Sequence, residues 1–115
     1  MKFGTGMDPA AFVSDETLAK WHKLGSEFVI LLAETLAQET GRKFYAVARN
    51  RQIKERVVWW KRPLIISMHP GIDHDHVDLW VDIHDPNLDR KLVLRVLNAE
   101  AIKFFKRRIN VHLQK

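Results

Sequence analysis

Nine consecutive residues, 76–84, alternate strictly between polar and apolar side chains. The apolar positions are Val77, Leu79, Val81 and Ile83, and the polar positions are His76, Asp78, Trp80, Asp82 and His84. Successive side chains of a β-strand point to opposite faces, so this pattern predicts a strand that is buried on one face only. The chain is therefore expected to contain a sheet with one packed face and one solvated face.

A long amphipathic helix is predicted before the strands. Between Ser14 and Thr40 the apolar residues recur at three- and four-residue spacing, which places them on one stripe of a helix. Ser14 or Asp15 can cap its start, and Gly41 suits the position just after its end. Gly25 interrupts the middle of the stripe, so we expect either a kink or a break into two helices there.

Further strands are predicted on both sides of the alternating segment. Residues 43–49 alternate, and the β-rich run 56–68 predicts one long strand or two short ones, with residues 50–55 as the connection. Pro63 places that run at a sheet edge or at a bend. Residues 91–96 alternate again and predict a strand, after which Asn98 is the expected N-cap of a last helix. Ile102, Phe105 and Ile109 form the apolar stripe of that helix.

The expected fold class is α+β. Its order is a long helix, about four strands and a C-terminal helix. Short connections between consecutive strands favour a mainly antiparallel sheet, with both helices packed on one face. We interpret residues 14–115 as one domain and residues 1–13 as a flexible leader.

Charge is distributed in blocks of alternating sign. Residues 1–40 and 63–89 carry net charges of −3 and −6, whereas residues 41–62 and 90–115 each carry +7, within a total of +5. Basic blocks of this density commonly contact phosphate or acidic protein surfaces. The alternative is internal: aspartates of one strand can pair with Arg or Lys of a neighbouring strand.

The first basic block is interleaved with aromatic residues, a combination suited to nucleic acid. Lys and Arg contact phosphates, and aromatic faces stack on the bases of a single strand. We therefore predict a non-enzymatic protein that binds nucleic acid and prefers single strands. The candidate binding residues are Tyr45, Arg49, Arg51, Lys54, Arg56, Trp59, Lys61, Arg62, Lys103, Lys106 and Arg107, with Trp80 as a further stacking candidate.

Two other functions fit the same residues. Four tryptophans in 115 residues and an edge-like strand near Pro63 can form a surface for an acidic protein or for a homo-oligomer. A metal-dependent nuclease or phosphodiesterase can use the polar strand face. Its candidate ligands are His76, Asp78, Asp82 and His84, completed by His69, His74 or Asp75.

Several classes of site are excluded by composition. The chain has no cysteine, which removes disulfides, thiolate nucleophiles and zinc sites built on sulfur. It has no P-loop, nucleophile elbow or HExxH motif, and we expect no cofactor. No apolar run approaches the ~18 residues of a spanning helix, so no membrane partner is expected and a cytoplasmic location is assigned by default.

Overall fold

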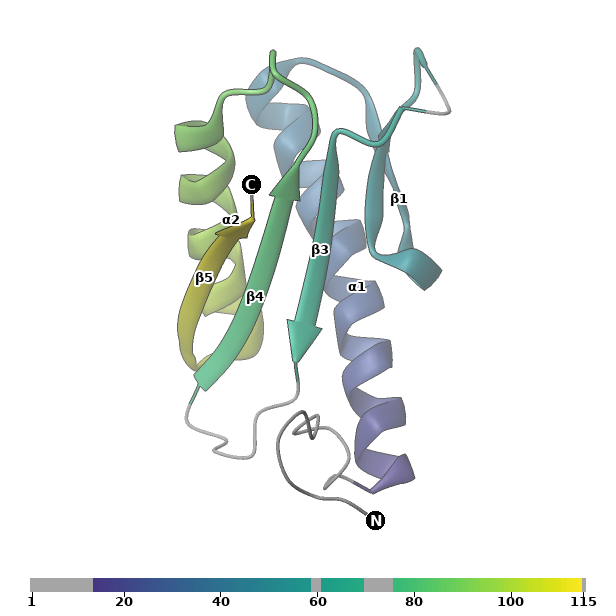
Figure 1. Cartoon of the computed structure of the whole chain (residues 1–115), viewed down its shortest axis with the longest axis vertical. Helices are drawn as coiled ribbons and strands as arrows, with labels where there is room; N and C mark the ends of the chain where they lie inside the picture. Colours follow the sequence, from purple (N-terminus) through teal and green to yellow (C-terminus); the bar gives the residue numbers. More distant parts are fainter. Residues whose placement is uncertain (1–13, 59–60, 70–75, 115) are drawn as a thin grey trace.

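The computed structural model describes residues 14–58, 61–69 and 76–114 (Figure 1). The elements are α1 (Asp15–Thr40), β1 (Phe44–Val47), the 3₁₀ helix η2 (Ala48–Asn50), β2 (Gln52–Glu55), β3 (Leu64–His69), β4 (His76–Ile83), α2 (Arg90–Phe105) and β5 (Arg108–Gln114). The predicted α+β class is confirmed. The predicted leader 1–13 and the stacking candidate Trp59 lie outside the described residues.

One five-stranded sheet organises the fold, with strand order β1-β2-β3-β4-β5. Neighbours from β1 to β4 are antiparallel, whereas β5 runs parallel to β4 after the crossover through α2. Figure 1 shows both helices behind the sheet, which leaves its other side without a helix. We call the helix side the inner face and the opposite side the outer face.

The first helix is continuous from end to end. The Ser14 hydroxyl accepts the N–H of Thr17 at 3.2 Å, and Gly41, at φ 74°, ends the helix in the left-handed conformation that glycine tolerates. The alternative of a break into two helices at Gly25 was wrong, since α1 runs without interruption from Asp15 to Thr40. Gly25 is buried, and a Cβ placed on it would lie 3.0 Å from Cε of Met68 in β3. This glycine therefore serves the close packing of α1 on the sheet.

The largest correction concerns the segment after β4. Residues 91–96, predicted as a strand, form the first half of α2, and the N-cap is Asp89 rather than Asn98. The carboxylate of Asp89 accepts the backbone N–H of Lys91 at 2.9 Å. The buried positions of this stretch are Val93, Val96 and Leu97, which lie three and four residues apart and so define a helical face.

Two further strands differ from the prediction. The expected connection 50–55 contains β2, and the expected C-terminal helix ends at Phe105, after which the chain adds β5. Of the described part of the predicted strand region 56–68, the residues from Leu64 onward form β3. The sheet therefore has five strands where about four were predicted.

The core fills the space between the inner face and the helices. Its largest fully buried side chains include Phe28 and Leu32 of α1, Leu79 of β4 and Leu97 of α2. Val77, Leu79 and Val81 are buried, which confirms the inner face of the alternating strand. No helix within the described ranges is long and apolar enough to cross a membrane.

Candidate nucleic-acid interface

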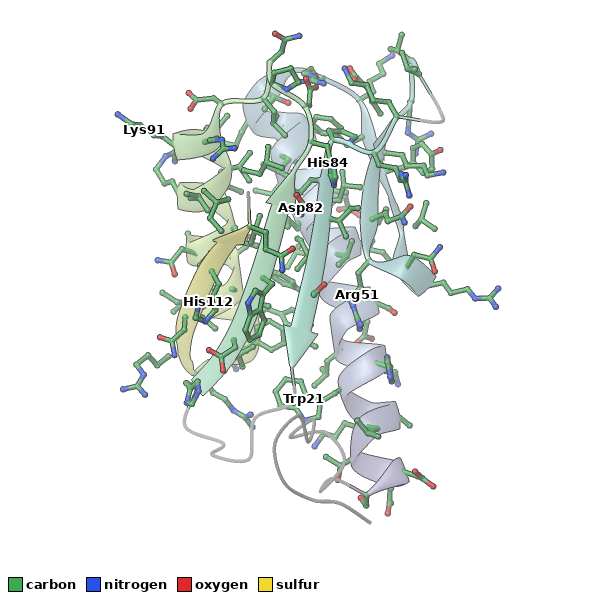
Figure 2. All side chains as sticks on the ribbon, in the orientation of Figure 1. Trp21, Arg51, Asp82, His84, Lys91 and His112 are labelled. Atoms are coloured by element: carbon green, nitrogen blue, oxygen red, sulfur yellow. The ribbon has the colours of Figure 1, made fainter. Side chains whose placement is uncertain are left out.

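Polar and aromatic side chains gather on the outer face because the period of every strand is two. Strand register and burial assign to this face Tyr45, Gln52, Lys54, Ile65, Ser67, His76, Asp78, Trp80, Asp82, Arg108, Asn110, His112 and Gln114. Figure 2 shows Asp82 and His112 on the side of the sheet turned away from the helices. The outer face therefore combines rings, cations and hydrogen-bonding groups on a surface that neither α1 nor α2 covers.

The centre of the outer face is a stack of two rings. Trp80 of β4 lies opposite His112 of β5 in the parallel register, and their ring centroids are 4.6 Å apart with planes inclined by 18°. The Nε2 atom of His112 lies 3.0 Å from Oδ1 of Asp78, and Nε2 of His76 lies 3.2 Å from Oδ2. Since an ionised carboxylate only accepts, both imidazoles donate to it.

Asp78 is held ionised by these neighbours. Partial burial disfavours its charged form, but hydrogen bonds from His112 and Asn110 and the charge of His76 outweigh that effect and hold its pKa below the ordinary value. An ionised Asp78 anchors both imidazole rings. The rigid orientation of His112 in turn supports the ring of Trp80.

A second aromatic position lies at the other side of the sheet. Tyr45 of β1 pairs with Lys54 of β2, and the guanidinium of Arg56 lies 5.5 Å from the centroid of the Tyr45 ring. A cation over an aromatic face is attracted by the negative charge of the ring face. The structure thus brings together three of the residues predicted from the basic block.

Other predicted cations have partners inside the protein. Lys61 lies 3.4 Å from the buried carboxylate of Asp85. The same carboxylate binds Nη2 of Arg42 at 2.5 Å, and Arg42 also binds Glu55 through Nη2 at 2.7 Å and Nε at 3.2 Å. The acidic and basic blocks therefore neutralise one another in part, through Asp85 at the end of β4.

The pKa values in this ion cluster follow from the hydrogen bonds. The bond to Glu55 raises the pKa of Arg42, against the opposing effect of burial, and the same bond lowers the pKa of Glu55. Burial opposes ionisation of Asp85, but Arg42 and the backbone N–H of Asn87 overcome it and keep its pKa below the ordinary value. All three groups stay charged near neutral pH.

The remaining predicted cations do not join one surface. Lys103 pairs with Glu100 at 3.0 Å, Lys106 is the C-cap of α2, and the guanidinium of Arg107 lies 5.6 Å from the ring centroid of the buried Trp21. In Figure 1, α2 lies on the opposite side of the molecule from β1.

The first basic block is also divided. Arg51 lies against α1, since its Nη1 is 3.2 Å from the Cβ position of Gly25. Arg49 is exposed on η2, and Arg62 is exposed in the connection between β2 and β3. Of the predicted cations, only Lys54 and Arg56 therefore accompany an outer-face ring.

The candidate metal ligands do not gather into one site. Its four candidate ligands fall into two pairs, His76 with Asp78 and Asp82 with His84, the second at 3.0 Å. Among the residues that the structure describes, no group of three or more His, Cys, Asp or Glu side chains can hold a metal ion. His74 and Asp75 lie outside those residues.

His112 and Arg108 were missed because the predicted C-terminal helix was extended through Arg108 and Ile109, which hid the strand that begins there. The signal was present: Arg108, Asn110, His112 and Gln114 alternate with three aliphatic residues, the same period of two that identifies residues 76–84.

A small hollow lies at the end of the outer face where β4 ends. Lys61, Arg62, Pro63, His84 and Asp85 line a volume of about 220 Å³. Within this hollow, Lys61 pairs with Asp85 at 3.4 Å, and His84 lies 3.0 Å from Asp82.

No protein-family model, curated protein or solved structure matches this chain. Fold and site geometry alone define its class, a two-layer α+β protein whose sheet presents an aromatic outer face.

Proposed function

We propose that the outer face binds single-stranded nucleic acid. The observation that carries this proposal is the Trp80–His112 stack on a sheet face that neither α1 nor α2 covers. Bases of any sequence have a π-face, so a preformed aromatic platform on a sheet accepts them without reading hydrogen-bond patterns. Neither described helix lies on the outer face, where it could enter a major groove, and this favours single strands over a duplex.

The two aromatic positions are spaced for several nucleotides. The pairing registers place Tyr45 level with His84, four residues along β4 from Trp80 and three strands away. With ~4.8 Å between strands and ~3.4 Å per residue, the rings are about 20 Å apart across the face. A single strand that crosses the sheet diagonally stacks one base at each ring and passes over Ile65 and Ser67 between them.

The charges that flank this path favour a phosphate backbone. Lys54 and Arg56 lie beside Tyr45, and Arg108 lies at the start of β5 opposite His76. Asp78 and Asp82 share the face, but each carboxylate is bound by a histidine. The cations at the two sides therefore face phosphate, while the histidine-bound carboxylates lie under the bases.

The test is fluorescence anisotropy of a labelled mixed-sequence single strand, titrated with protein at low and moderate salt. Replacing Trp80 with Ala removes one stacked base, which costs about 1–3 kcal/mol and weakens binding about 5- to 150-fold. Lys54→Gln is expected to weaken binding and to reduce its salt dependence by about one phosphate contact.

The matched control is Lys91→Gln, which removes an equal charge from α2, away from the outer face (Figure 2). It should change affinity less than Lys54→Gln. Binding that Trp80→Ala leaves intact, or that ignores salt, would refute the proposal.

A further inference from the structure

The strand β5 ends the sheet with an unprotected edge. It spans seven residues, pairs with β4 on one side and has no described strand on the other. Natural edge strands are commonly blocked by Pro, Lys, a bulge or an inward-pointing charge. The stretch Ile109–Leu113 contains none of these residues, and its pairing with β4 is unbroken. Such an edge favours pairing with another strand.

An apolar groove adjoins this edge. Leu94, Arg95 and Asn98 of α2 and Val111 and Leu113 of β5 line a volume of about 420 Å³. Leu113 is 37% exposed, and Ile102, which follows Leu94 and Asn98 on the same helix face, is 47% exposed. The groove and the free edge therefore form one continuous surface, which we call the β5 edge surface.

The charges around the β5 edge surface are already paired within the chain. Arg95 binds Glu39 at 3.4 Å, and Lys103 binds Glu100 at 3.0 Å. An acidic or basic partner thus gains little from this rim, whereas an apolar, uncharged partner strand fits it. The central stretch Ile109–Leu113 of a second copy has this character, since it contains no Lys, Arg, Asp or Glu and the charged Arg108 lies at the end of the strand.

We propose that two copies of this chain pair their β5 strands antiparallel about a two-fold axis perpendicular to the sheet. With the axis at Val111, Ile109 of one copy lies opposite Leu113 of the other, and Arg108 lies opposite Gln114. No like charges meet among the described residues of the strand, and the groove residues of each copy cover those of its partner. This inference does not depend on the proposed function.

Symmetry also selects β5 over the other edge of the sheet. Pairing of β5 with β1 of another copy would be heterologous and would propagate into a filament, whereas β5 with β5 closes at two copies. The strand β1 has only four residues, against seven in β5. In this symmetric dimer the outer faces of the two copies point in the same direction and join at the paired β5 strands. They therefore form one continuous surface.

The test is analytical ultracentrifugation of the full chain over a wide concentration range. A reversible monomer–dimer equilibrium is expected, and Leu94→Lys combined with Leu113→Lys should weaken it at least about tenfold, since four charges would enter the interface. The matched control is Val57→Lys, because Val57 is 78% exposed and lies outside the β5 edge surface. Circular dichroism verifies that each variant is folded.

A spin-label measurement identifies the edge that pairs. The chain has no cysteine, so a single Asn98→Cys or Arg49→Cys variant carries one label per copy. Labels on Asn98, beside β5, should show a short distance in the dimer, and labels on Arg49, beside β1, a long one of about 40 Å or more across ten strands. A monomer at every concentration, a dimer insensitive to the two lysines, or a shorter Arg49 distance would overturn the proposal.

Discussion

The guanidinium of Arg42 lies 2.5 Å from the carboxylate of Asp85, a side chain with no exposed surface, although the two residues are 43 positions apart. Arg42 follows α1 and Asp85 follows β4. Their ion pair, extended by Glu55 and Lys61, therefore connects the helix-to-sheet junction with the end of β4.

Asp85→Asn should destabilise the protein substantially. The amide keeps the shape but not the charge, so Arg42 loses one of its two carboxylate partners in a partly buried position. Removal of one partner from a buried pair typically costs about 3 kcal/mol or more, and urea denaturation would measure the loss in the free energy of unfolding. Glu39→Gln, in the exposed pair with Arg95, should cost less than about 1 kcal/mol. Equal losses in the two variants would contradict a structural role for Asp85.

Acid should unfold the protein through the same cluster. The pKa values of Asp85 and Glu55 are held below their ordinary values of 3.8 and 4.5. A carboxylate whose pKa is lowered by folding contributes stability above its unfolded pKa, and that stability is lost as pH falls through the folded pKa. The free energy of unfolding, measured by urea titration at several pH values, should therefore decline steadily below about pH 4.5. Asp85→Asn should show a shallower decline over the same range.

The start of α2 gives a third test. Asp89→Ala removes the cap that accepts the N–H groups of Lys91 and Leu92, and should cost about 1 kcal/mol of stability. Asn98 is exposed within the helix, so Asn98→Ala should be neutral or stabilise by a few tenths of a kcal/mol, because Ala has the higher helix propensity. Thermal unfolding of the Asp89→Ala and Asn98→Ala variants measures both effects. The reverse order of effects would support a helix that begins at Asn98.

Sequence periodicity correctly predicted those elements whose residues match only one period. Residues 76–84 and 14–40 each match one period over many residues, and β4 and α1 followed. Residues 91–96 are fewer, and their apolar residues, with Leu97, also fit a helical period. Residues 108–114 have a period of two, but Ile109 also continues the three- and four-residue spacing of Ile102 and Phe105. The assignment of Ile109 to a helical stripe with Ile102 and Phe105 therefore concealed β5.

The candidate site could be predicted only in part, because it depends on contacts between residues that are far apart in the sequence. The outer face of β4 was predicted, and with it the outward position of Trp80. The partner of Trp80 was not, because His112 reaches it only through a parallel crossover. Likewise, local charge counts identified the basic block. They could not identify the ion pair of Lys61 with Asp85, because it depends on the turn after β4.

The last prediction concerns the carboxylate beneath the ring stack. Asp78→Asn removes one negative charge from the proposed nucleic-acid path and keeps an oxygen that accepts a hydrogen bond from a histidine. Unit charges about 8 Å apart in water interact by about 0.5 kcal/mol, so affinity for a single strand should rise roughly twofold at low salt and return toward the wild-type value as salt screens the charge. Glu34→Gln makes the same charge change on the exposed surface of α1 and should have a smaller effect. If anisotropy titrations show equal gains for both variants, net charge rather than the outer face controls binding.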